Sequence, residues 1–192
     1  MAEPAIKRMT LDEFLRWEDG TDTRYELVGG FPVAMAPPAR AHGMLCARLA
    51  GIIDAAVRSR RPCSAQTEAG IARPDRDDAC YIADIAVSCR PYQRGEQLVS
   101  DPVLVVEVLS PGTERYDRRT KVPAYCEIAS LNEILLIDSE AAYAEILRRE
   151  GDRWTVALLH GREAILHLTS VELRVSMAEL YEGIDLEVDR AS

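Results

Sequence analysis

Two consecutive apolar segments, each interrupted by a single acid, constrain the fold of this chain most. Asp84 stands among apolar residues in the segment 81–87, and Glu107 stands among apolar residues in the segment 103–109. Strands that are apolar at successive positions, and not only at alternate ones, are covered on both faces. We therefore predict two neighbouring strands inside a sheet that packs against helices, which is an α/β fold.

Periodicity and turn residues place further elements around these two strands. The central order is helix, three strands, helix and strand, over residues 42–60, 63–72, 80–88, 103–109, 116–128 (kinked at Pro123) and 132–138. A short helix capped by Thr10 and Glu13 and a hairpin about Gly29-Gly30 come before them. Antiparallel strands follow over 143–149, 154–159 and 164–168, and then a short helix capped by Ser176.

The length and the continuity of the pattern predict one domain over residues 1–192. Neither a repeat nor a low-complexity linker divides the chain, and no apolar run approaches the roughly 20 residues that cross a bilayer. The first residues lack the build of a signal peptide. We expect a cytoplasmic protein without a membrane partner.

Composition limits the kinds of site that the chain can form. Five cysteines without a CxxC pair indicate neither a zinc ribbon nor a disulfide scaffold, and most of them lie in apolar surroundings typical of small core residues. The net charge of -9 argues against broad binding of nucleic acid through a cationic surface. A local basic channel or a bound metal ion would still supply positive charge.

The two acids within the apolar strands predict a cation site. An ionised carboxylate in such a strand costs several kcal/mol unless it is paired or binds a metal. If the strands are neighbours, Asp84 and Glu107 form one cluster of oxygen ligands, the type that suits Mg²⁺ or Mn²⁺. The alternative is that each acid pairs with an arginine or lies exposed at a strand end.

Lys121 is one of only two lysines beside 21 arginines, and it follows Glu107 by 14 residues. A turn at residues 110–112 lets the next helix run back along the sheet and bring Lys121 near the acids. An ammonium group there could orient an attacking water or stabilise the charge of a pentavalent phosphorane. The alternative is a solvated helix face shared with Arg118 and Arg119.

Several of these residues together resemble one known family. They are the segments 25–30, 83–84 and 105–113 with Asp117, Lys121 and Tyr125. This pattern is similar to that of the bacterial Uma-two family of restriction endonucleases, within the PD-(D/E)xK nuclease superfamily. The resemblance covers about residues 9–181 and implies a restriction-endonuclease-like core, an αβββαβ mixed sheet flanked by helices.

The resemblance also implies roles for individual residues. It implies Asp84 and Glu107 as metal ligands, with a backbone carbonyl near Val108. The superfamily lysine usually lies two residues after the second acid, where this chain has Leu109, so the resemblance points to Lys121 on the helix. The proline that usually precedes the first acid is Ala83 here, which alters the entry to the strand and not the ligand.

Three more residues are candidates for a supporting role around the metal or the substrate. Glu26 matches an acidic position of the family, with a salt bridge to Arg24 or another arginine as the alternative. His42 could contact a phosphate, carry a proton or cap its helix. Gln66 is a weaker candidate on the first core strand. Tyr125 is expected to pack against the sheet.

The expected function is that of a Mg²⁺-dependent (or Mn²⁺-dependent) endonuclease that hydrolyses phosphodiester bonds, most plausibly in DNA. The alternative is a non-catalytic or dimerising binding protein that keeps the nuclease fold. Apolar edges in the C-terminal strands would suit a homodimer. Nothing in the sequence identifies a recognition sequence or separates DNA from RNA.

Overall fold

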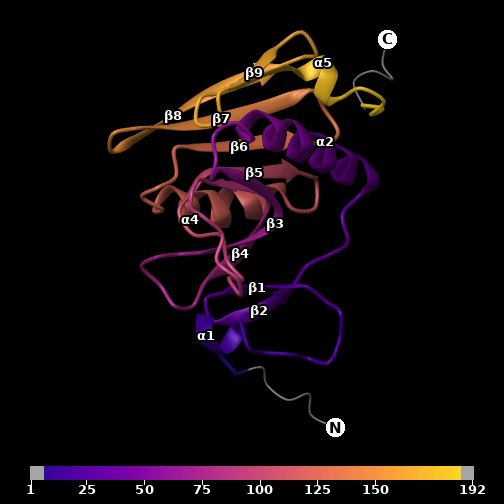
Figure 1. Ribbon diagram of the computed structural model, residues 1–192. Helices are drawn as coiled ribbons and strands as arrows, with labels where there is room; N and C mark the ends of the chain where they lie inside the picture. Colours follow the sequence, from indigo (N-terminus) through magenta and orange to yellow (C-terminus); the bar gives the residue numbers. More distant parts are fainter. Residues whose placement is uncertain (1–6, 187–192) are drawn as a thin grey trace.

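The computed structural model describes residues 7–186, and one mixed sheet runs through most of it (Figure 1). The order along this sheet is β2-β1-β4-β5-β6-β7-β8, and β3 pairs with the other edge of β4. Its strands are β1 Tyr25–Val28, β2 Phe31–Ala34, β3 Ser64–Ala72, β4 Cys80–Ser88, β5 Pro102–Leu109, β6 Glu133–Asp138, β7 Tyr143–Glu150 and β8 Arg153–His160. Only β5 and β6 run parallel, because a helical crossover joins them.

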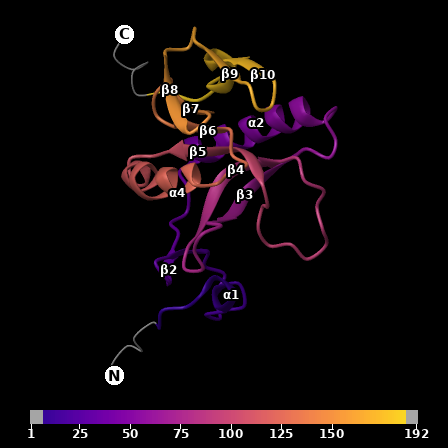
Figure 2. The same cartoon turned by 90° about the vertical axis from the view of Figure 1, so that its left-hand side faces the viewer.

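Helices cover both faces of the central strands, as the apolar pattern predicts (Figure 2). Helix α2 (Arg40–Val57) packs its buried residues, Leu45, Leu49, Ile53 and Val57, on one face. Tyr125 and its apolar neighbours from the crossover helix pack on the other face. The order α2-β3-β4-β5-helix-β6 confirms the predicted α/β core.

The crossover helix differs from the expected single helix with a kink at Pro123. It consists of α3 (Glu114–Tyr116), a π-helical turn η1 (Asp117–Lys121) and α4 (Val122–Cys126). Proline has no N–H and its ring crowds the carbonyl four residues earlier, so Pro123 cannot close an α-helical bond to residue 119. Val122 instead donates to the Asp117 carbonyl, five residues back, and the irregularity falls before the proline.

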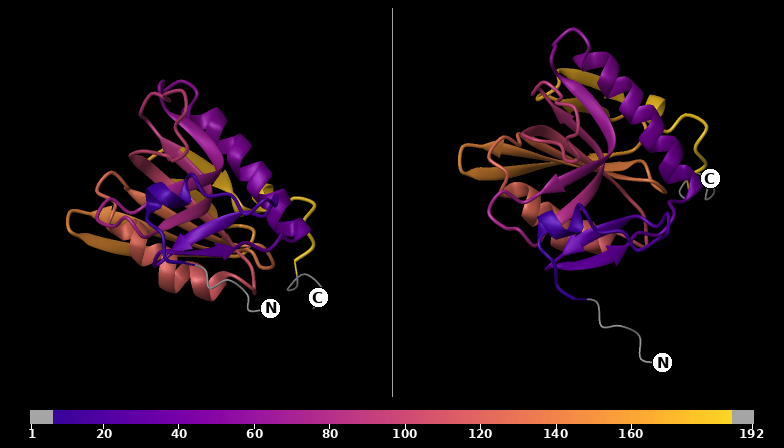
Figure 3. Two further views of the ribbon diagram at one scale, coloured as in Figure 1. Left: turned by 90° about the horizontal axis from the view of Figure 1, so that it is seen from below. Right: turned by 60° about the horizontal axis from the view of Figure 1, so that its bottom comes forward.

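The two ends of the chain add smaller elements (Figure 3). Helix α1 (Leu11–Phe14) has the predicted capping box between Thr10 and Glu13. Strands β9 (Ile165–Leu168) and β10 (Leu173–Ser176) form a separate two-stranded sheet, of which β10 was not expected, and Ser176 caps α5 (Met177–Leu180). The outer parts of the predicted domain, residues 1–6 and 187–192, lie outside the described residues.

One expectation about the cysteines is wrong. Cys63 and Cys89 form a disulfide beside the last pair of the β3–β4 ladder, Ser64 with Ser88. The two residues are 26 positions apart and become neighbours only through the register of two strands, so their spacing gives no sign of the bond. Cys46, Cys80 and Cys126 are free thiols, as expected of core or half-buried residues.

Among the described residues, no helix is both long enough and apolar enough to cross a lipid bilayer.

Glu133 on β6 connects the small C-terminal sheet to the large one. Its side chain is 1% exposed and accepts a hydrogen bond from Arg148 Nε at 2.7 Å. It also accepts bonds from the backbone N–H and the hydroxyl of both Thr169 and Ser170. These donors lower the pKa of Glu133 against the effect of burial.

We therefore expect Glu133→Ala to destabilise the fold strongly, because it leaves Arg148 and four other donors without their acceptor. The free energy of unfolding should fall by about 3 kcal/mol. This value is at the lower end of the range for breaking a buried ion pair, because Arg148 is partly exposed. Thermal unfolding should shift down by about 6–12 °C in a chain of this size. Glu127→Ala, at an exposed carboxylate after α4, is the control and should leave the melting temperature within about 2 °C. Equal melting temperatures of the two variants would contradict this account.

Candidate functional site

A break in the large sheet positions the site. One edge of β4 pairs with two different strands, with β1 at Leu27–Cys80 and with β5 from Ile85–Val106 onward. Between these two contacts β1 and β5 diverge, so the backbone of β4 around residue 82 has no strand partner on that edge. A buried N–H or C=O without a partner costs several kcal/mol, so side chains must take the place of the missing strand.

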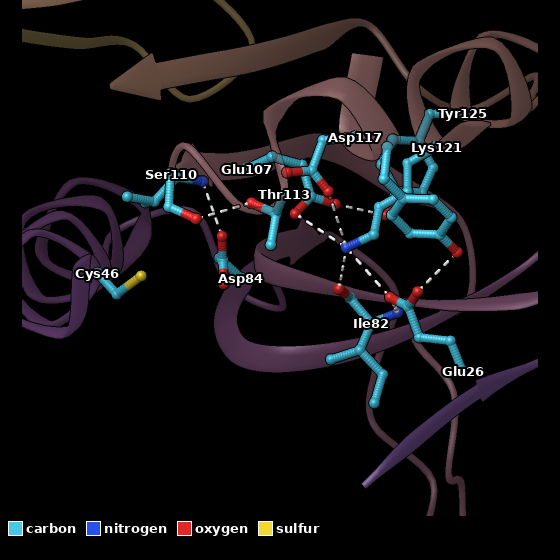
Figure 4. A network of polar contacts seen from close by, with 12 residues as sticks. Glu26, Cys46, Ile82, Asp84, Glu107, Ser110, Thr113, Asp117, Lys121 and Tyr125 are labelled. Atoms are coloured by element: carbon cyan, nitrogen blue, oxygen red, sulfur yellow. Dashed lines mark hydrogen bonds and ion pairs between the residues drawn. The ribbon is translucent and has the colours of Figure 1, made fainter. Parts of the chain in front are cut away.

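Glu26 and Lys121 supply those partners (Figure 4). The N–H of Ile82 donates to Glu26 Oε1 at 2.9 Å, and Lys121 Nζ donates to the carbonyl oxygen of Ile82 at 2.9 Å. Glu26 comes from the N-terminal hairpin, on β1, and Lys121 from the π-helical turn. Two segments distant in sequence therefore close the break with opposite charges.

Lys121 is surrounded by carboxylates. Its Nζ atom lies 3.1 Å from Glu26 Oε1, 3.3 Å from Glu107 Oε2 and 3.5 Å from Asp117 Oδ1. Lys121 is 5% exposed, and the three acids are equally buried. One buried ammonium thus faces three buried carboxyl groups, and their charges raise the pKa of Lys121 although burial works against it.

Two tyrosines complete the hydrogen bonding of the acids. Tyr125 donates from its hydroxyl to Glu107 Oε1 at 2.6 Å, and Tyr116 donates to Glu26 Oε2 at 2.8 Å. Tyr125 packs edge-on against Tyr81, as expected, but it also fixes the orientation of Glu107. Burial raises the pKa of both hydroxyl groups, and the carboxylates beside them raise it further.

Asp84 lies at the outer side of this cluster and is partly open to solvent. Its Oδ2 atom accepts a hydrogen bond from the Val108 N–H at 2.7 Å and lies 3.3 Å from His42 Nε2. If the register that pairs Ile85 with Val106 is continued by one residue, Asp84 faces Glu107 across the two strands. The negative charge of Asp84 acts on Glu107 and raises its pKa.

Acids exceed cations in this cluster. Burial raises the pKa of Glu107 well above its ordinary value, with Lys121 opposing and the neighbouring Asp84 and Asp117 adding to the rise. Burial also raises the pKa of Asp117. Three carboxyl groups around one ammonium, with Asp84 on the neighbouring strand, provide more hard oxygen donors than cations, which is the donor set that divalent cations such as Mg²⁺ and Mn²⁺ take.

The structure brings together most of the residues singled out in the sequence. Lys121 forms ion pairs with Glu26 and Glu107, and Asp84 pairs with His42 and accepts a hydrogen bond from Val108, the residue after Glu107. The alternative of a solvated Lys121 is wrong, because its side chain is buried.

Two details of the supporting residues differ from the alternatives considered. Glu26 pairs with Lys121 and not with Arg24, which pairs with Glu68 instead. His42 is no cap either, because α2 begins at Arg40 with Ala39 as its N-cap.

Gln66 does not join the cluster. It is exposed on β3, opposite Ala86. Asp117, Tyr116 and Cys46 were not assigned roles from the sequence, although all three contact the candidate residues. For Asp117 two signals were available: it is one of the residues that carry the family resemblance, and it lies four residues before Lys121, a spacing that shares a helix face.

We expect stability without added metal to fall as the pH rises from about 5 to 8. Burial raises the pKa of Glu107 and Asp117, and for His42 the contact with Asp84 raises the pKa although burial opposes it. Such groups stabilise the fold below their unfolded pKa, and this contribution is lost as the pH rises through the folded pKa. Each pKa unit of difference is worth about 1.4 kcal/mol, or about 3–6 °C of melting temperature.

Melting curves in EDTA across this pH range provide the test. Glu107→Gln cannot titrate and should flatten the slope, whereas Glu163→Gln, at an exposed position, should keep the slope of the wild type. A slope in Glu107→Gln as steep as that of the wild type would show that Glu107 does not titrate in this range.

Comparison with known proteins gives a family and a fold. The family model Uma2, described as "Putative restriction endonuclease", matches residues 11–178. Two uncharacterized proteins of Synechocystis are similar, one at 26% identity over 92% of this chain and 93% of its own length, the other at 23% over 90% and 99%. A crystal structure from Anabaena variabilis, of "a putative nuclease belonging to DUF820", superposes with a TM-score of 0.76 at 19% identity, covering 92% of this chain and 99% of that one. The chain therefore belongs to the Uma2 family, the family that its sequence motifs resemble.

Proposed function

We propose that this protein is a divalent-metal-dependent endonuclease that hydrolyses phosphodiester bonds in DNA. The observation that carries the proposal is the buried lysine enclosed by three carboxylates, next to the partly open Asp84, in a break of the central sheet. A network that served stability alone would balance its charges, because each unpaired buried charge is costly. An excess of acids fits a site that receives a cation.

The residues present fit a hard divalent cation. Asp84 and Glu107 are the ligands that we propose, because the register of β4 and β5, continued by one residue, sets them opposite each other and Asp84 opens to solvent. The Val108 N–H and Tyr125 hold these two carboxylates in place. When bound, Mg²⁺ or Mn²⁺ would supply positive charge to the phosphate oxygens of the substrate.

Lys121 has the geometry of a fixed positive charge beside that position. The Ile82 carbonyl and Glu26 hold its Nζ atom, so the ammonium group does not depend on a flexible side chain for its placement. A preorganised cation of this kind stabilises negative charge that develops on a phosphate in the transition state. Glu26 acts through Lys121 and is a positioning residue.

Exposed arginines near the cluster would compensate for the net charge of -9. Arg119 lies in the π-helical turn and Arg115 precedes it in α3, both exposed, and the exposed Arg40 opens α2 two residues before His42. None of the three forms an ion pair with the residues that the structure describes. Unpaired guanidinium groups are suited to phosphate contacts that locate a DNA backbone without reading its sequence. A cytoplasmic location and a homodimer remain predictions.

We expect Mg²⁺ or Mn²⁺ to stabilise the protein. At about 100 times the dissociation constant, binding adds about 2.7 kcal/mol, and the melting temperature should rise by about 5–10 °C. Asp84→Asn removes a proposed ligand and should abolish most of this rise. Asp152→Asn, at an exposed acid in the turn between β7 and β8, is the control and should keep the rise. A melting temperature indifferent to millimolar metal would count against the cation site.

The two lysines of the chain allow a matched test of activity. Lys121→Arg keeps the charge but replaces a compact ammonium by a planar guanidinium, which the enclosed position cannot orient in the same way. Cleavage of DNA should fall by about a hundredfold, or about 3 kcal/mol of transition-state stabilisation. Lys7→Arg, at an exposed position, should cleave like the wild type. Cleavage is measured on supercoiled plasmid, linear duplex DNA and RNA with Mg²⁺ and with Mn²⁺.

The same assay decides between the two functions. Wild-type activity in Lys121→Arg would remove Lys121 from the catalytic group. Cleavage of RNA in place of DNA would correct the substrate and keep the reaction. If the wild type binds divalent metal yet cleaves none of these substrates, the non-catalytic binding protein that keeps the nuclease fold becomes the better description.

A further inference from the structure

A second group of potential metal ligands lies on the other side of Asp84, facing α2. His42 and Cys46 occupy positions i and i+4 of α2, so both side chains leave the same face of the helix. His42 Nε2 lies 3.3 Å from Asp84 Oδ2, and His42 Nδ1 lies 3.5 Å from Cys46 Sγ. One ligand atom from each of the three residues lies within 4.8 Å of the other two.

We propose that His42, Cys46 and Asp84 form a site for a thiophilic divalent cation of the Zn²⁺ class, which shares Asp84 with the oxygen site around Glu107. A thiolate and an imidazole prefer Zn²⁺ over Mg²⁺, which binds oxygen almost exclusively. The proposal requires no nuclease activity, and it holds whether or not the chain cleaves DNA.

The spacing of the three groups suits a tetrahedral ion. Zinc bonds of about 2.0–2.3 Å place neighbouring ligand atoms about 3.3–3.7 Å apart. His42 Nε2 has this spacing to Asp84 Oδ2, and His42 Nδ1 has it to Cys46 Sγ, but one ion binds only one of the two ring nitrogens. Binding therefore needs rotation of side chains that draws together three ligand atoms already within 4.8 Å of one another. Three protein ligands leave the fourth position for water or another small ligand.

The charges and the exposure around the three residues favour a cation as well. Among the described residues, His42 is the one basic group within ion-pair distance of Asp84. All three candidate ligands are partly exposed, so an ion can reach them from solvent without opening the core.

Cobalt(II) provides a direct test, because a thiolate bound to cobalt gives a charge-transfer absorption that oxygen and nitrogen ligands do not give. The full chain is purified without reductant, which keeps the Cys63–Cys89 disulfide, and is titrated with Co²⁺ and then with Zn²⁺. We expect one equivalent of Co²⁺ to produce the thiolate band. Zn²⁺ should then displace the bound Co²⁺ and remove the band. Millimolar Mg²⁺ should leave the band in place.

Variants identify the ligands. Cys46→Ser should abolish the band and weaken binding by more than about a hundredfold, since loss even of an outer-shell partner costs about 10–100-fold. Cys126→Ser, which removes another partly exposed free thiol, is the matched control and should keep both the band and the affinity. Glu107→Gln removes the proposed ligand that belongs to the oxygen site alone and should also keep them, so failure of the proposed nuclease activity would not count against this site.

Two results would overturn the proposal. One is the absence of a thiolate band in the wild type, and the other is a band that persists in Cys46→Ser. If Cys46→Ser fails to fold by circular dichroism, His42→Ala carries the test and should weaken binding of Co²⁺ at least tenfold. Binding of Co²⁺ to His42→Ala with wild-type affinity would equally remove the site.

Discussion

The unpaired edge of β4 is the constraint on which the rest of this structure depends. Where β1 and β5 diverge, the peptide groups of Ile82 have no strand to pair with on that edge, and they are partly buried. Glu26 and Lys121 bond to them in place of a strand. A charged side chain in this position needs further charges around it, because its desolvation costs several kcal/mol. The backbone requirement thus brings a lysine and its carboxylates to the centre of the sheet.

The same arrangement joins stability and chemistry in one place. Lys121 neutralises part of the repulsion among Glu26, Glu107 and Asp117, but it cannot neutralise all of it. The fold tolerates the remainder because Tyr125 and Tyr116 donate to two of the acids and because burial favours protonation of Glu107. Departures from the usual rules of burial are expected at a functional site, because interactions elsewhere in the fold compensate for the stability that the site costs.

Sequence reasoning found the residues whose presence breaks a pattern. Asp84 and Glu107 interrupt apolar strands, and Lys121 stands out among arginines, so the three could be predicted as a set although none of them is decisive alone. Glu26 was found only through the family resemblance, and the alternative of a local pair with Arg24 is wrong. Asp117 lies in a charged segment that looks like a solvated helix face, and only the π-helical turn directs it inward.

The hairpin that carries Glu26 has a consequence for how the protein assembles. The charge cluster consists of Lys121 and the acids at positions 26, 107 and 117, so nearly a hundred residues separate its first member from its last. Contacts over such distances along the chain form after local ones, because the entropy of closing the loop must first be overcome. A growing or partly folded chain therefore has the lysine without its full set of acids. The charge cluster becomes complete only when the first and the middle thirds of the chain have packed together. The site therefore exists only in the folded protein.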